Sequence, residues 1–231
     1  MPPRSHLNRT VRASAWMYAT RALAFGWALV LVNTFGISGY GIYAFAFAAA
    51  AMVALPLDSY FLVRAPRVID SLFPRERSTR TLVGLALLIS GCACWPGSFV
   101  LGFALSKAGI DNVFNASRSH LIRRGEPDLA QRADASRQII GMVGGTVYVF
   151  VAEAPSLEIA GLIYLLGCLI PVAPKVRTLL TAKPVGPERT RNTAAILVES
   201  IGGVAYVQGD VLLLAALASS SAAGYYSLGT M

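Results

Sequence analysis

Residues 39–64 read GYGIYAFAFAAAAMVALPLDSYFLVR, and this stretch decides the class of protein. It is almost entirely apolar, and Asp58 is its only charged residue before the final arginine. A helix needs about 20 largely apolar residues to cross the hydrocarbon core of a membrane. Because a backbone inside lipid must satisfy its own hydrogen bonds, such a run predicts a transmembrane helix.

The rest of the chain has the same character. Of its 231 residues, 55% are hydrophobic and 14% charged, with a mean hydropathy of +0.57, which is too apolar for an ordinary soluble domain. We therefore expect an all-α integral membrane protein with seven spans and the start of an eighth. The expected spans are 13–35, 40–63, 81–95, 98–121, 139–152, 159–172, 192–218 and 224 onward.

Basic residues alternate with these spans in a way that predicts the orientation. Eighteen of the 20 Lys and Arg residues fall on one side of the seven-span arrangement. They are Arg4, Arg9, Arg12, Arg64, Arg67, Arg75, Arg77, Arg80, Arg118, Arg123, Arg124, Arg132, Arg137, Lys175, Arg177, Lys183, Arg189 and Arg191. By the positive-inside rule the amino terminus and these segments face the cytoplasm. Topology thus accounts for the net charge of +8 without nucleic acid as a partner.

The spans and loops divide the chain into four parts. Residues 1–12 form a cytoplasmic tail, 13–173 a six-helix bundle, 174–191 a cytoplasmic linker, and 192–231 the start of a second bundle. Alignment of Gly41 with Gly224 also brings Gly26 onto Gly209. Internal repeats of this kind are common in transporters.

Two patches of sequence resemble a known family. The first is Gly39-Tyr40-Gly41-Ile42-Tyr43, followed one span later by Leu62-Val63-Arg64. The second is Gln208-x-Asp210 with a leucine-rich continuation and then Gly224-x-Tyr226-Ser227. Both are similar to segments of the bacterial polysaccharide and O-antigen flippases of the multidrug/oligosaccharidyl-lipid/polysaccharide superfamily.

The resemblance implies both a function and a fold. Such proteins flip lipid-linked oligosaccharide or polysaccharide intermediates, which supply lipopolysaccharide and exopolysaccharide, across the bacterial inner membrane by alternating access of two bundles. The implied partners are the bilayer, the lipid-linked oligosaccharide and other polysaccharide-assembly membrane proteins. No cofactor is expected, and a coupling cation stays open. Because the family's fold has two six-helix bundles, we expect this chain to be truncated after Met231.

Polar residues at membrane depth are the candidate binding residues. Placing a polar side chain in the hydrocarbon core costs free energy, so such residues usually mark a functional site. They are Arg21, Lys107, Asp111, Arg118, Glu199, Gln208 and Asp210. Positive side chains would receive a pyrophosphate or acidic sugars, the amide would bind hydroxyls, and carboxylates would balance charge or couple transport to a cation.

Five of these residues also have a purely structural alternative. Lys107 and Asp111 are four residues apart on one helical face, so they can simply neutralise each other. Arg21 and Arg118 can extend toward the membrane surface. Asp210 can anchor a helix interface.

Two other functions compete with the flippase. A drug or cation antiporter of the same superfamily would favour a drier, more aromatic cavity centred on carboxylates. A membrane-embedded transferase would need clustered carboxylates for Mg²⁺, whereas Glu126 and Asp128 lie among arginines. Cys92-x-Cys94 does not have the spacing of a zinc site. We therefore expect neither catalysis nor a metal centre.

Overall fold

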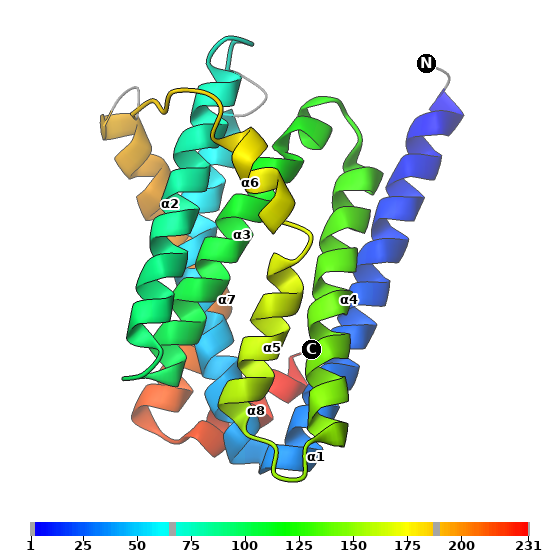
Figure 1. Cartoon of the computed structure of the whole chain (residues 1–231), viewed down its shortest axis with the longest axis vertical. Helices are drawn as coiled ribbons and strands as arrows, with labels where there is room; N and C mark the ends of the chain where they lie inside the picture. The colour runs from blue at the N-terminus through cyan, green and yellow to red at the C-terminus, as the bar shows by residue number, and fades with distance from the viewer. Residues whose placement is uncertain (1–2, 65–67, 187–189, 231) are drawn as a thin grey trace.

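The computed structural model describes residues 3–64, 68–186 and 190–230, and their regular structure is entirely α-helical, as predicted (Figure 1). The described helices are α1 (Pro3–Arg64), α2 (Phe73–Cys94), α3 (Phe99–Arg123), α4 (Pro127–Val151), α5 (Leu157–Leu169), α6 (Ala173–Leu179), α7 (Thr190–Leu217) and α8 (Ser220–Gly229). The side chains of Arg4, Arg64, Arg67, Arg189 and Arg191 lie outside the described residues.

A subset of these helices has the length and apolar composition needed to cross a membrane. In the described part of the chain, α1 and α7 are long and apolar enough to cross a membrane. A third span results if α5 and α6, which meet at a 49° bend, are counted as one. The remaining long helices, α2, α3 and α4, carry more charge along their length.

Helix α1 is a hairpin rather than one continuous rod. Gly36 has φ 71° and ψ 174°, a backbone conformation that is essentially restricted to glycine. Trp27 and Tyr43 are 16 residues apart, a separation of about 24 Å along a straight helix. The Trp27 Nε1 nevertheless donates a hydrogen bond of 3.2 Å to the Tyr43 hydroxyl. The two arms of α1 thus correspond to the expected spans 13–35 and 40–63, and they fold against each other at Gly36.

The arginine-rich segments gather at one end of the molecule, which we call the basic end. Near the amino terminus, the Arg9 Nη1 donates to the carbonyl of Gly125, in the connection between α3 and α4, at 3.0 Å. At the start of α2, the Arg75 Nε donates to the carbonyl of Lys183, between α6 and α7, at 3.2 Å. Figure 1 shows these connections at its upper end and the turn of α1 at its lower end.

Three helices begin where the sequence predicted loops. Helix α2 begins eight residues and α4 twelve residues before the expected spans, and α6 lies largely in the expected linker 174–191. Each of the three has a proline in its first turn, where the missing N–H removes no helical hydrogen bond. Charged residues in their first turns lower the local hydropathy, so an analysis based on hydropathy places these helix starts in loops.

Helices α7 and α8 form a second hairpin that parallels the first. A shift of 183 residues takes Gly41 to Gly224 and takes Gly36 to Ser219. Ser219 is extended, at φ −165° and ψ 160°, and separates α7 from α8. The chain therefore reverses at equivalent positions in the two hairpins.

The same shift relates two hydrogen bonds that close the hairpins. In the first hairpin, Trp27 donates to Tyr43. Their equivalents in the second are Asp210 and Tyr226, and there the Tyr226 hydroxyl donates to the Asp210 Oδ2 at 2.5 Å. A tyrosine thus ties the second arm to the first in both hairpins.

The two hairpins pack against each other through their glycines. A Cβ at Gly41 would lie 1.7 Å from the carbonyl oxygen of Ser220, and a Cβ at Gly224 would lie 2.5 Å from that of Ile37. Ile37 and Ser220 are themselves equivalent under the 183-residue shift. Reciprocal contacts of this kind characterise an approximate twofold arrangement. The repeat expected from the sequence therefore places its two copies in direct backbone contact.

Aromatic side chains form the centre of the core between α1, α3 and α5. The Tyr43 ring lies 5.3 Å from that of Phe103, and the Phe103 ring lies 6.2 Å from that of Tyr164, measured between centroids. All three residues are buried. These edge-to-face and stacked contacts are the arrangements that aromatic pairs prefer, so they fix the position of the hairpin α1 against the other helices.

Candidate functional site: an aromatic cavity beside an ionic cluster

A cavity of ≈330 Å³ lies between the two hairpins and helices α4 and α5. We call it the aromatic cavity, because its lining includes Trp27, Tyr40, Tyr43, Phe47, Tyr164 and Tyr226. Its uncharged polar lining consists of Gln138, Gln208, Ser227 and Thr230. No charged side chain lines it among the residues that the structure describes. Its volume falls in the range of small-molecule sites.

Hydrogen bonds hold Tyr40 of the first hairpin and Tyr226 of the second hairpin in place. The hydroxyls of Tyr40 and Ser227 are 3.1 Å apart and join α1 to α8. The Tyr226 hydroxyl is occupied by the Asp210 carboxylate. Both tyrosines line the cavity, and their hydroxyls make hydrogen bonds to other side chains of the protein.

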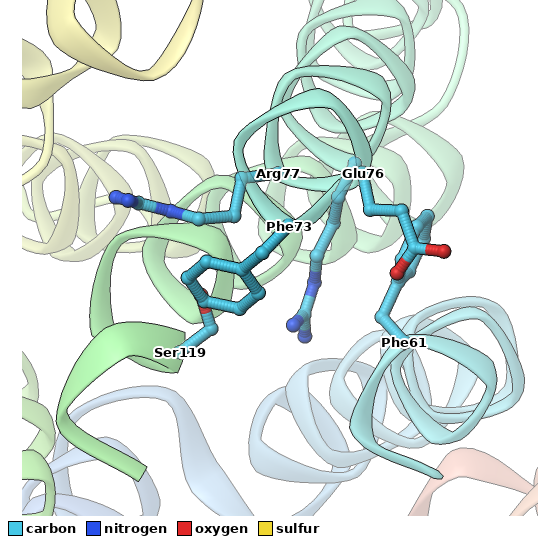
Figure 2. Close-up of a pocket in the computed structure, with 6 residues that line it drawn as sticks. Phe61, Phe73, Glu76, Arg77 and Ser119 are labelled. Atoms are coloured by element: carbon cyan, nitrogen blue, oxygen red, sulfur yellow. The ribbon is translucent and has the colours of Figure 1, made fainter. Parts of the chain in front are cut away.

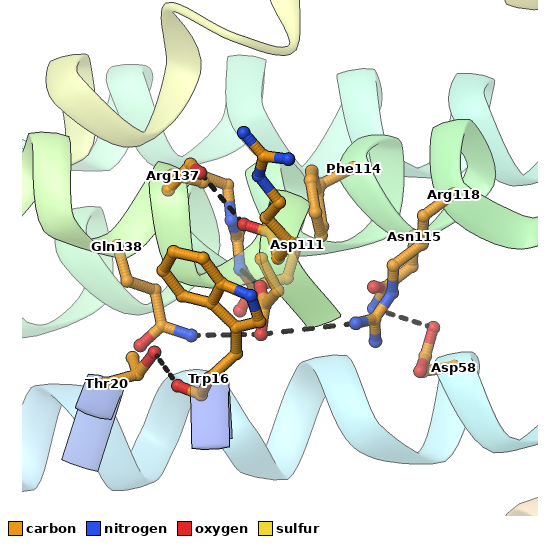
Figure 3. A network of polar contacts seen from close by, with 12 residues as sticks. Trp16, Thr20, Asp58, Asp111, Phe114, Asn115, Arg118, Arg137 and Gln138 are labelled. Carbon is orange, nitrogen blue, oxygen red and sulfur yellow. Dashed lines mark hydrogen bonds and ion pairs between the residues drawn. The ribbon is translucent and has the colours of Figure 1, made fainter. Parts of the chain in front are cut away.

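A group of charged residues between α3 and α4 forms what we call the ionic cluster, drawn in part in Figure 3. Asp111 accepts hydrogen bonds from the Lys107 Nζ and the Arg137 Nη1, both at 2.5 Å. The Arg137 Nη2 also donates to Asp134 at 2.8 Å. The Arg118 Nη1 lies 4.0 Å from the other oxygen of Asp134. Three cations thus share two carboxylates.

The ionic cluster is well shielded from its surroundings. Lys107 is 5% exposed and Arg137 is 4% exposed. The guanidinium of Arg137 lies 4.3 Å, and that of Arg118 5.4 Å, from the centroid of the Phe114 ring. Charges removed from water need partners of opposite sign, and breaking such a group is costly. The cluster therefore ties α3 to α4 strongly.

Two residues form a common wall between the cavity and the cluster. Phe47 lines the cavity, and the Lys107 Nζ lies 5.1 Å from the centroid of its ring on the cluster side. Gln138 also lines the cavity, and its Nε2 donates to the Asp134 Oδ2 at 3.0 Å. The cluster thus supports the cavity from behind without entering it.

A second buried charge pair lies toward the basic end. Arg80 forms an ion pair with Asp58, and the Asn115 Nδ2 donates to the same carboxylate at 3.0 Å. Arg80, Phe61 and four neighbours line a small pocket there (Figure 2). Its volume of ≈10 Å³ holds about one water molecule. These residues therefore join α1, α2 and α3 and leave no room for a larger ligand.

The predicted site residues on α7 separate into two groups. Gln208 is half-buried and lines the aromatic cavity. Asp210 is exposed and contributes indirectly, because it holds Tyr226 in the lining. Glu199 is exposed on α7 and lies outside the lining.

The predicted residues on α3 meet in the ionic cluster. Lys107 and Asp111 pair within one helix, as their spacing suggested, and Arg118 faces the same group through Asp134. They lie behind the cavity wall rather than in the lining. Their geometry therefore matches the structural alternative, in which Lys107 and Asp111 neutralise each other within one helix.

Arg21 occupies a different position from the other predicted cations. It is exposed on the first arm of α1 and lies outside the cavity lining. Ala24 and Ala28, three and seven residues further along, do line the cavity. Residues at these spacings share one face of a helix. Arg21 thus continues the cavity-facing stripe one turn toward the basic end.

Three residues of α4 belong to the site although the sequence reading left them out. The sequence places all three, Asp134, Arg137 and Gln138, in the expected loop between the spans 98–121 and 139–152. The signal that could have revealed them is their spacing, since Asp134 is placed to pair with Arg137 and Gln138 one turn later on a helix. It becomes visible only once α4 is extended back to Pro127.

No group of three His, Cys, Asp or Glu side chains suited to a metal ion occurs among the described residues. The thiols of Cys92, Cys94 and Cys168 are free.

The chain was also compared with protein-family models, with curated proteins and with solved structures. None of the three comparisons finds a match.

Proposed function

We propose that this chain acts as a membrane transporter that moves lipid-linked oligosaccharide or polysaccharide intermediates across the bacterial inner membrane. Its amino terminus and basic end would face the cytoplasm, and α2, α3 and α4 would cross the membrane together with α1, α5 and α7. The proposal joins the family resemblance of two sequence patches to the presence of the aromatic cavity.

The observation that carries the proposal is the position of the cavity between two equivalent hairpins. Transporters of several folds bind their cargo where internal repeats meet. Here the hairpin α1 and the hairpin α7–α8 both contribute side chains to one lining, Trp27 and Gln208 among them. Rocking of one hairpin against the other about the contact of Gly41 and Gly224 would open the cavity to alternate sides.

The cationic residues would have separate roles in such a transporter. Lys107 and Arg118 are engaged with carboxylates, so they would maintain the protein scaffold. Arg21 is exposed one turn beyond the cavity lining, so its guanidinium would receive the diphosphate of the cargo while the glycan extends into the cavity.

A vesicle assay tests the proposal directly. The chain is reconstituted into phospholipid vesicles that contain a polyprenyl-diphosphate-linked oligosaccharide, and a glycosidase is added outside. We expect the inner-leaflet pool to become digestible, and we expect Arg21→Ala to slow this exposure. Arg12→Ala, which removes another exposed cation from the same helix, is the matched control. An inner pool that stays protected would contradict the proposed function.

The aromatic lining also favours a second candidate, an exporter of hydrophobic cations. Six aromatic residues and no charged side chain face the cavity among the described residues, and aromatic faces attract cations. Efflux of tetraphenylphosphonium from the same vesicles, without movement of the oligosaccharide lipid, would favour this second function.

A further inference from the structure

We propose that the aromatic cavity binds an uncharged sugar ring through Gln138 and Gln208, and that it excludes acidic sugars and the diphosphate. This inference rests on the proposed function and names the part of the cargo that the cavity accepts. It differs from the expectation that cations would line the binding site.

Charge is the first argument. An anion that enters a low-dielectric cavity loses its hydration and needs a nearby cation in return. None of the described lining residues is charged. The cations behind Phe47, Lys107 and Arg137, already pair with Asp111. An acidic sugar would therefore bind more weakly than its neutral counterpart.

The shape and chemistry of the lining supply the second argument. A pyranose has faces of C–H groups and a rim of hydroxyls, so it suits a site with aromatic walls and a few polar groups. Phe47 and Tyr226 lie in the lining and are each 37% exposed, so they offer ring surface to a ligand. The large apolar area of such rings is well suited to contact with a flat, partly apolar ligand.

The two glutamines supply the hydrogen bonds. An amide offers both donors and acceptors, and a sugar hydroxyl likewise donates and accepts. Gln138 gives one hydrogen bond to Asp134 and retains its carbonyl oxygen and second N–H. Gln208 makes no hydrogen bond to another described residue. Since they come from α4 and α7, a bound ring would bridge the first bundle and the second hairpin.

The test measures binding without translocation. The full chain, carrying Trp16→Phe and Trp95→Phe so that Trp27 is the only tryptophan, is purified in detergent and titrated with methyl β-D-glucopyranoside. We expect a saturable change in the emission of Trp27, which lies in the lining. We expect glucuronate to bind at least about tenfold more weakly, as a ligand that leaves a buried charge unpaired does.

Variants assign the binding to the two amides. Gln138→Ala and Gln208→Ala should each weaken glucoside binding roughly tenfold, as expected for the loss of a hydrogen bond in a buried site. Gln131→Ala, the same change on α4 outside the lining, should have no effect. Gln208→Lys should create affinity for glucuronate, and this gain cannot arise from a folding defect.

Several results would overturn the inference. They are equal or tighter binding of glucuronate, no saturable response to the glucoside, or unchanged affinity in both alanine variants. The two proposals fail separately, because this assay needs no bilayer. Translocation without glucoside binding would overturn the inference alone, and glucoside binding without translocation would overturn the proposed function alone.

Discussion

At the scale of single residues, Asp111 binds two buried cations and joins α3 to α4. It accepts hydrogen bonds from both Lys107 and Arg137, which come from different helices and are almost fully buried. Arg137 also uses Asp134. Loss of the charge on Asp111 would leave three cations facing one carboxylate in a shielded environment.

We therefore predict that Asp111→Asn lowers the stability of the protein by about 3 kcal/mol, the cost of leaving a buried ion pair without one partner. The melting temperature in detergent measures the effect. The matched control is Asp210→Asn, because Asp210 is exposed and its described bond is to Tyr226 alone, so we expect a clearly smaller loss. Equal shifts for the two variants would show that the ionic cluster does not stabilise the fold.

At the scale of elements, apolar runs located the helices but not all of their ends. The apolar run 40–63 predicted an arm of α1, because the mean hydropathy of a run depends only on its own residues and needs no knowledge of their neighbours in the fold. Helix α4 was underestimated by twelve residues, since Arg137 and Asp134 count as loop residues when their respective partners on α3, Asp111 and Arg118, are unknown. Charge neutralised across helices cannot be read from a local window.

The contact between the two hairpins gives a prediction at the same scale. The hydroxyls of Ser38 and Ser220 are 2.7 Å apart. In a chain whose three native cysteines are replaced by alanine, Ser38→Cys with Ser220→Cys should form a disulfide under mild oxidation. Addition of Gly41→Ala should greatly reduce this crosslink, because the new Cβ would collide with the Ser220 backbone.

Gly26→Ala is the control for that experiment, since a Cβ at Gly26 meets nothing within 4 Å. The crosslink yield, read from a cyanogen bromide digest on a denaturing gel, should remain unchanged in this variant. If Gly41→Ala also leaves the yield unchanged, the hairpins do not pack as closely as described.

At the scale of the whole molecule, the distribution of charge was accessible from the sequence, whereas the cavity was not. Alternation of basic and non-basic loops is a one-dimensional pattern, and the basic segments indeed meet at one end. The cavity, by contrast, depends on helices distant in sequence, so Gln208 was its one lining residue among the predicted site residues. In the sequence, aromatic residues such as Trp27 and Tyr164 cannot be distinguished from residues that pack in an ordinary apolar core.

The orientation proposed for the membrane gives the third prediction. Gly97, in the turn between α2 and α3, and Gly186, between α6 and α7, are exposed and have room for a side chain. A membrane-impermeant maleimide added to intact cells should label Gly97→Cys in the cysteine-free chain. It should label Gly186→Cys only after the membrane is permeabilised. The reverse pattern would mean that the basic end faces outward, against the proposed topology.

The ionic cluster has a consequence for how the protein is made. Within α3, Lys107 and Asp111 already form an i,i+4 pair, and within α4, Asp134 and Arg137 form an i,i+3 pair. A ribosome completes α3 before α4, so under the proposed topology each nascent segment would carry its own counter-ion when it enters the membrane. The bond from Arg137 to Asp111 then adds a link between the two helices, while Lys107 keeps Asp111 and Arg137 keeps Asp134, so α3 and α4 can join without breaking either internal pair.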